Sequence, residues 1–218
     1  MVLVVVSAVF VRVEEFVNAF DYNYKPPADG TFAVYIEAAP SRFGEGKRLQ
    51  LLRIGVKGRV IPDQDRKNAI LTFVIDVSGS MDMENRLELV KRSLELLVEQ
   101  LRPTDSVSIV VYGTDARVIL EPVRGDRKET ILRAIYSLQP EGVTNAEAGL
   151  KLAYRMALQA FNAEGINRVI LCSDGVANVG NTGAESIWDQ IESYARERIT
   201  RTRVGFGTSN CTDVLMER

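Results

Sequence analysis

The chain has 218 residues, of which 46% are hydrophobic, and a formal net charge of −2. This length can bury a core in one large domain, or in a domain with an appendage, and the charge balance lacks the basic footprint of a nucleic-acid binder. The sequence contains no histidine, which excludes Ser-His-Asp catalysis and histidine-ligated zinc. Its two cysteines are too few and too far apart for a zinc cluster or a disulfide framework.

Residues 1–60 predict a small α+β module. The apolar run Val2–Val11 is too short to span a bilayer and has no positively charged n-region, so we expect a strand, with a damaged or truncated leader as the alternative. Helical spacing then follows at Val13, Phe16, Val17 and Phe20. Alternating apolar residues at 32–36 and 52–56 indicate two half-exposed strands. The polar residues 61–69 are the expected linker to a second domain, residues 70–218.

From Ile70 onward, apolar strands alternate with amphipathic helices. Strands are predicted at 70–75, 107–112, 116–120, 169–172 and from 204, and helices at 87–101, 131–138, 145–161 and 187–195. The turn after Tyr112 is too short for a crossover between parallel strands, so the strand from Ala116 should be an antiparallel neighbour. The predicted fold class is therefore α/β: a mostly parallel, Rossmann-like sheet with helices on both faces and one antiparallel edge strand.

Oxygen-bearing side chains follow the first of these strands. Asp76, Ser78 and Ser80 come directly after the apolar run from Ile70 to Ile75. The carboxyl ends of strands are where open α/β sheets place their ligands, and an all-oxygen set suits a hard divalent cation. A polar turn that caps the next helix is the alternative interpretation.

Two further polar residues are expected at the same sheet edge. Thr144 opens the long helix, where it is a natural N-cap and could equally present its hydroxyl to a ligand. Asp174 ends the strand at 169–172 as Asp76 ends its own strand. If these two strands are adjacent, two carboxylates and three hydroxyls line one crevice.

These segments together resemble a known family. Asp76-Val77-Ser78-Gly79-Ser80, Gly142-Val143-Thr144-Asn145 and Ser173-Asp174-Gly175 are similar to the three-part metal-ion-dependent adhesion site of von Willebrand factor type A domains. The resemblance covers the chain from about Ala69 to its end. The module before Gly58 is similar, more loosely, to an N-terminal region of some bacterial envelope proteins that carry this domain.

The resemblance implies a function. Ser78, Ser80 and Thr144 would contact Mg²⁺, with Mn²⁺ or Ca²⁺ as alternatives, and Asp76 and Asp174 would hold it largely through water. In the family, the metal accepts an Asp or Glu side chain from a partner protein. The resemblance therefore implies a non-enzymatic protein-binding module, with a bacterial, extracytoplasmic setting and no membrane span of its own.

The family pattern also sets an expectation for the chain's end. The family sheet usually continues with a further strand and helix, whereas this sequence stops at Arg218. The sequence therefore predicts a domain that lacks its last strand and helix.

Two other functions stay open at this point. One is a Mg²⁺-assisted phosphoryl-transfer enzyme with an aspartate nucleophile, although Ser78 stands where that chemistry commonly places a second aspartate and no Gly-rich phosphate loop is present. The other is a scaffold that binds partners without metal and keeps a vestigial site.

Overall fold

The computed structural model describes residues 13–42, 49–174 and 198–206. The chain divides into two compact units, Met1–Arg66 and Lys67–Arg218. The strand expected at 2–11 and the helix expected at 187–195 lie outside the described residues. Within the described part, no helix combines the length and apolar character needed to cross a membrane.

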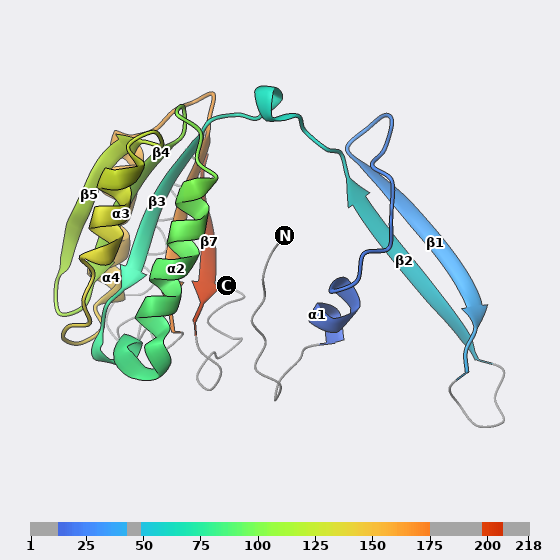
Figure 1. The fold of residues 1–218 in the computed structure, drawn as a ribbon, viewed down its shortest axis with the longest axis horizontal. Helices are drawn as coiled ribbons and strands as arrows, with labels where there is room; N and C mark the ends of the chain where they lie inside the picture. Colours follow the sequence, from blue (N-terminus) through green and yellow to red (C-terminus); the bar gives the residue numbers. More distant parts are fainter. Residues whose placement is uncertain (1–12, 43–48, 175–197, 207–218) are drawn as a thin grey trace. The chain divides into compact units, whose positions relative to one another are not determined.

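The first unit contains a short helix and a β-hairpin (Figure 1). These are α1 (Val13–Asn18), β1 (Phe32–Pro40) and its antiparallel partner β2 (Gln50–Gly58). The helix and both strands confirm the predictions made from the apolar spacing. The strands are more exposed than expected, however, since Ile36 is 67% and its cross-strand partner Ile54 is 63% exposed.

The second unit is built on a sheet in the order β5-β4-β3-β6-β7. Its strands are β3 (Ala69–Asp76), β4 (Ser106–Tyr112), β5 (Ala116–Arg124), β6 (Ile166–Ser173) and β7 (Ile199–Gly205). All pairings are parallel except that of β4 with β5, which confirms the predicted antiparallel edge strand. β3 lies between β4 and β6, so the two strands that end in Asp76 and precede Asp174 are neighbours.

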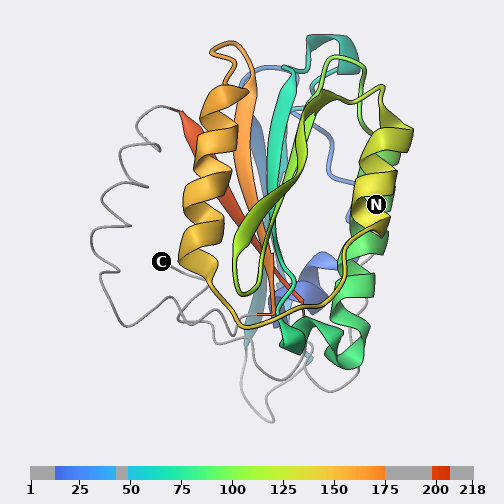
Figure 2. The ribbon, with the colours of Figure 1, turned by 90° about the vertical axis from the view of Figure 1, so that its left-hand side faces the viewer.

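Helices cover both faces of this sheet (Figure 2). They are α2 (Arg86–Glu99) and α3 (Lys128–Tyr136) on one face and α4 (Ala146–Gln159) on the other. Alternate side chains of β3 pack on opposite faces of the sheet. Phe73 and Ile75 belong to the core with α2 and α3, whereas Val74 belongs to the core with α4. The structure therefore confirms the predicted α/β architecture.

Helix α4 packs against the sheet at Gly149. A Cβ atom at this position would lie 2.7 Å from the nearest ring carbon of Tyr112, a distance that would force the ring to move. The glycine therefore lets the helix seat directly over the end of β4, where Tyr112 is fully buried.

Asp105, which is 1% exposed, links backbone segments at the amino end of the sheet through hydrogen bonds. Its carboxylate accepts hydrogen bonds from the backbone amides of Ala69, at 2.8 Å, and Arg102, at 2.9 Å. Burial acts to raise the pKa of Asp105, but these two amides and the Arg102 side chain outweigh it and hold the pKa below its usual range.

Replacing Asp105 by asparagine should lower the free energy of unfolding at neutral pH by about 1–3 kcal/mol, because the amides lose a charged acceptor. The pKa of Asp105 is lower in the folded than in the unfolded chain, so this stabilisation is present above the unfolded value and is lost as the pH falls through the folded value. Urea unfolding in EDTA at several pH values should show the difference shrinking toward acid. The exposed carboxylate of Asp126 supplies the control, Asp126→Asn, and a difference that stayed constant with pH would contradict the assignment.

Candidate metal centre

Asp76 is the fully buried last residue of the central strand β3. Its Oδ1 accepts a hydrogen bond from the backbone amide of Ser78, at 2.9 Å. Its Oδ2 accepts from the hydroxyl of Tyr112, at 3.1 Å, and from Oγ of Ser173, at 3.2 Å. Donors from the ends of β4 and β6 and from the turn after β3 thus converge on one carboxylate.

The electrostatics of Asp76 point to uncompensated negative charge. Burial raises the pKa of this carboxyl, the hydrogen bonds from Ser78 oppose the rise, and the nearby charge of Asp174 adds to it. Burial and the charge of Asp76 also raise the pKa of Tyr112 well above its usual range, so its hydroxyl remains a donor. A buried carboxylate whose charged form is disfavoured is one that a bound cation would stabilise.

The two predicted serine ligands lie next to each other. Oγ of Ser78 and Oγ of Ser80 are 3.2 Å apart, with Ser78 buried and Ser80 half-buried. Ser78 is the N-cap of a 3₁₀ segment, η2 (Gly79–Asn85), and Ser80 is the second residue of that segment, so both belong to one turn, the serine turn. The amide of Gly79 donates to the carbonyl of Gly142, at 3.1 Å, which brings the loop before α4 against this turn.

Thr144 is half-buried and stands two residues after Gly142, in the loop that meets the serine turn through the Gly79–Gly142 hydrogen bond. The expectation that Thr144 caps the helix is wrong. The N-cap of α4 is Asn145, whose Oδ1 accepts a hydrogen bond from the amide of Ala148 at 3.2 Å. Both residue types are good caps, and the structure uses the second of the two.

Asp174 directly follows β6, is 1% exposed, and forms an ion pair that was not predicted. Nη1 of Arg86, the first residue of α2, donates to its Oδ2 at 2.8 Å. Sequence spacing could not pair residues this far apart. One signal was available, because a cation at a helix N-terminus opposes the helix dipole and therefore requires a specific partner.

The donor set fits a hard divalent cation. Asp76, Asp174, Ser78, Ser80 and Thr144 offer only carboxylate and hydroxyl oxygens, the ligand type that Mg²⁺, Mn²⁺ and Ca²⁺ prefer. The cluster holds two buried carboxylates and one buried guanidinium, that of Arg86, which pairs with Asp174, so acidic groups outnumber basic ones. Among the described residues, no group of three or more Asp, Glu, Cys and His side chains could hold a metal, so a site here needs the hydroxyls.

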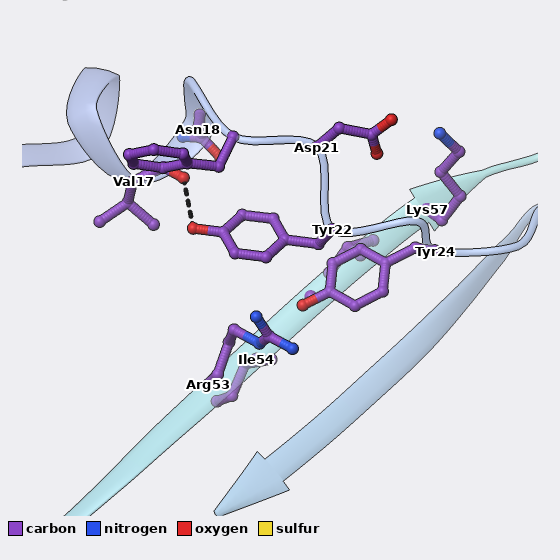
Figure 3. A pocket seen from close by; sticks show the side chains of 11 residues that line it. Val17, Asn18, Asp21, Tyr22, Tyr24, Arg53, Ile54 and Lys57 are labelled. Carbon is purple, nitrogen blue, oxygen red and sulfur yellow. Dashed lines mark hydrogen bonds between the residues drawn. The ribbon is translucent and has the colours of Figure 1, made fainter. Parts of the chain in front are cut away.

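The first unit holds a hollow of about 240 Å³, lined in part by Tyr22, Tyr24 and Arg53 (Figure 3). The Tyr22 hydroxyl donates to the carbonyl of Val17, at 2.8 Å. The Arg53 guanidinium lies 4.6 Å from the centre of the Tyr22 ring, which is cation–π distance. The chain's own arginine thus occupies the aromatic face of this hollow.

Comparison with known proteins gives matches to both units. The family model for the von Willebrand factor type A domain matches residues 71–176, and a model described as von Willebrand factor matches residues 4–52. The chain is 40% identical over 216 residues to the protein YfbK of Escherichia coli K12, covering 95% of this chain and 37% of that relative. It is 30% identical over 166 residues to sll0103 of Synechocystis, covering 75% of this chain and 38% of that relative. The chain thus spans little more than a third of the length of these relatives.

Solved structures share the fold. A von Willebrand factor type A protein from Catenulispora acidiphila has a TM-score of 0.57 at 18% identity, over 86% of this chain and 42% of that one. The manganese-loaded TRAP protein of Plasmodium vivax has a TM-score of 0.54 at 19% identity, over 81% of this chain and 62% of that one. At these identities, the likeness establishes the fold alone.

Replacing Tyr112 by phenylalanine should lower the free energy of unfolding of the metal-free protein by about 1–2 kcal/mol, because buried Asp76 loses a hydrogen-bond donor. Urea unfolding in EDTA measures this loss. Tyr136→Phe is the matched control, since the Tyr136 hydroxyl donates to Glu95 on the exposed surface, at 2.7 Å, and should cost under about 0.5 kcal/mol. Equal losses in the two variants would contradict the role given to Tyr112.

Proposed function

The chain belongs to the von Willebrand factor type A domain family, and we propose that it is a divalent-cation-dependent protein-binding module without enzymatic activity. The main support for this proposal is a buried cluster at the carboxyl edge of the sheet, which contains Asp76, Ser78 and Asp174. In this cluster the buried acidic groups outnumber the one buried basic group. Members of this family are often metal-dependent adhesion modules, and the likeness to a manganese-loaded domain of the same fold agrees with that role.

Each residue of the cluster has a role in this proposal. The hydroxyls of Ser78, Ser80 and Thr144 would contact Mg²⁺, with Mn²⁺ or Ca²⁺ as alternatives. Asp76 and Asp174 would hold it, largely through bound water, as suits a cation that gives up its waters reluctantly. When bound, the metal would supply an exchangeable coordination position that accepts an Asp or Glu side chain of a partner protein.

The protein's own part is to hold these oxygens in place. Hydrogen bonds from Ser78, Tyr112 and Ser173 fix the Asp76 carboxylate, so little side-chain freedom remains to be lost when a cation arrives. The bond between Gly79 and Gly142 keeps the serine turn against the loop that carries Thr144. The loops around the site would then supply partner specificity.

An enzymatic role has less support. In phosphoryl transfer with an aspartate nucleophile, the second position after the nucleophile would carry an acid, whereas here it carries Ser78, whose Oγ lies 3.2 Å from Oγ of Ser80. A hydroxyl with an ordinary pKa is a poor general acid at neutral pH. A metal-independent scaffold remains the opposing proposal, and metal titration separates it from ours.

Titration of Mg²⁺ and Mn²⁺ into the chelator-treated protein, followed by calorimetry, should show binding to a single site. Asp76→Asn and Ser78→Ala should each weaken it at least about tenfold, because each removes a charge or a ligand from the cluster. Ser93→Ala is the matched control, since the Ser93 hydroxyl only donates to the Leu89 carbonyl on the exposed side of α2, at 2.8 Å. A folded parent protein that binds neither metal would overturn the proposal in favour of the metal-independent scaffold.

A further inference from the structure

Arg86 is the buried cation of the candidate metal centre. It is 2% exposed, although it stands at the first position of α2. Its Nη1 donates to Oδ2 of Asp174, at 2.8 Å, and lies 3.5 Å from the carbonyl oxygen of Ser80. Its Nη2 lies 3.2 Å from Oε2 of Glu84. One guanidinium therefore touches two residues that the proposed function assigns to the metal.

The local structure around Arg86 is unfavourable by itself. The two preceding residues, Glu84 and Asn85, adopt left-handed backbone conformations with φ of 54° and 56°. The arginine also puts a positive charge at the positive end of the helix dipole, and its burial removes that charge from water. A buried ion pair is weak evidence for stability, so stabilising the fold does not by itself explain these features.

The charge of the cluster suggests what the arginine does. The buried side chains here are the two carboxylates of Asp76 and Asp174 and the one guanidinium of Arg86, whereas Glu84, which also pairs with Arg86, is exposed to solvent. With both buried carboxylates ionised, a bound dication would bring these three buried groups and the metal to a net charge of about +1 rather than to neutrality. This differs from a site of two carboxylates alone, which a dication would make neutral. A site left with positive charge attracts a further anion and binds the dication less tightly.

We propose that Arg86 is a built-in counter-cation that holds Asp174 when no metal is bound, lowers the affinity for divalent metal, and leaves the loaded site positively charged for a partner's carboxylate. This inference rests on the proposed function. Arg86 acts through Asp174 and the Ser80 carbonyl, so it is a positioning residue and not itself a ligand.

Two effects of Arg86 on metal affinity oppose each other. Its hydrogen bond orients the Asp174 carboxylate, which helps a metal, while its charge repels a metal bound beside that carboxylate. Repulsion should dominate, because it acts on a doubly charged ion in a buried, weakly screened place. Orientation matters less, since Asp174 is buried at the end of a paired strand and has little room to move.

The test is calorimetric titration of Mg²⁺ alone and Mn²⁺ alone into the whole chain, in the parent and in Arg86→Gln, Arg86→Met and Arg86→Lys. The two neutral variants should bind both metals about tenfold more tightly than the parent, because the repelling charge is gone. The lysine variant keeps the charge and should bind like the parent, although it cannot reproduce the planar arginine contact.

Thermal unfolding gives a second readout. In EDTA the neutral variants should melt at lower temperature than the parent, since Asp174 has lost its partner, and excess Mg²⁺ should raise their melting temperature more than it raises the parent's. Arg102→Met is the control. It removes an arginine that contacts buried Asp105 at the opposite, amino end of the sheet, so it should lower stability without changing metal affinity.

The outcomes separate this inference from the proposed function. A parent that binds no metal overturns the function and the inference together. A parent that binds metal, with neutral Arg86 variants that bind equally or more weakly, overturns only the inference. Neutral variants that fail to fold even in excess Mg²⁺ also overturn it, because Arg86 would then be a structural cation that a metal cannot replace.

Discussion

The structure of the second unit depends on burying one carboxylate at the end of its central strand. Asp76 is fully buried, and its oxygens are satisfied by the Ser78 amide and by the hydroxyls of Tyr112 and Ser173. Those donors stand at the ends of β4 and β6 and in the turn after β3, so the carboxylate fixes three segments at one point. A one-residue slip of either neighbour would turn its donor to the opposite face of the sheet. The polar cluster thus also specifies strand register.

The same cluster connects the two helix layers. Tyr112 donates to Asp76 from the face where Gly149 of α4 lies against its ring. Arg86 reaches Asp174 from α2, which packs on the other face. Helices on opposite sides of the sheet therefore meet through the polar groups at its carboxyl edge. This arrangement explains how the carboxyl edge of the sheet can hold carboxylates that are almost completely removed from solvent.

Much of this could be predicted from local pattern, and the failures have physical causes. Apolar runs identified the buried strands, and the short turn after Tyr112 identified the antiparallel edge. The start of β7 at Ile199 was missed because four consecutive polar residues, Thr200 to Arg203, separate its apolar residues Ile199 and Val204. The sequence offered Thr144 either as the N-cap or as a ligand, and the structure places the cap at Asn145, because both residue types suit that position. The ion pair between Arg86 and Asp174 could not be predicted from the sequence, because only the folded sheet brings these two distant residues together.

The charge on the cluster has a consequence for how metal and partner would act on each other. A cation bound beside an internal arginine is incompletely neutralised, so a partner's carboxylate would supply the missing negative charge. By thermodynamic linkage, the partner would then tighten metal binding by the same factor by which the metal tightens partner binding. The metal and the partner would each bind weakly alone and more tightly when the other is bound. Such reciprocity suits a reversible contact, because either chelation of the metal or loss of the partner would release the complex.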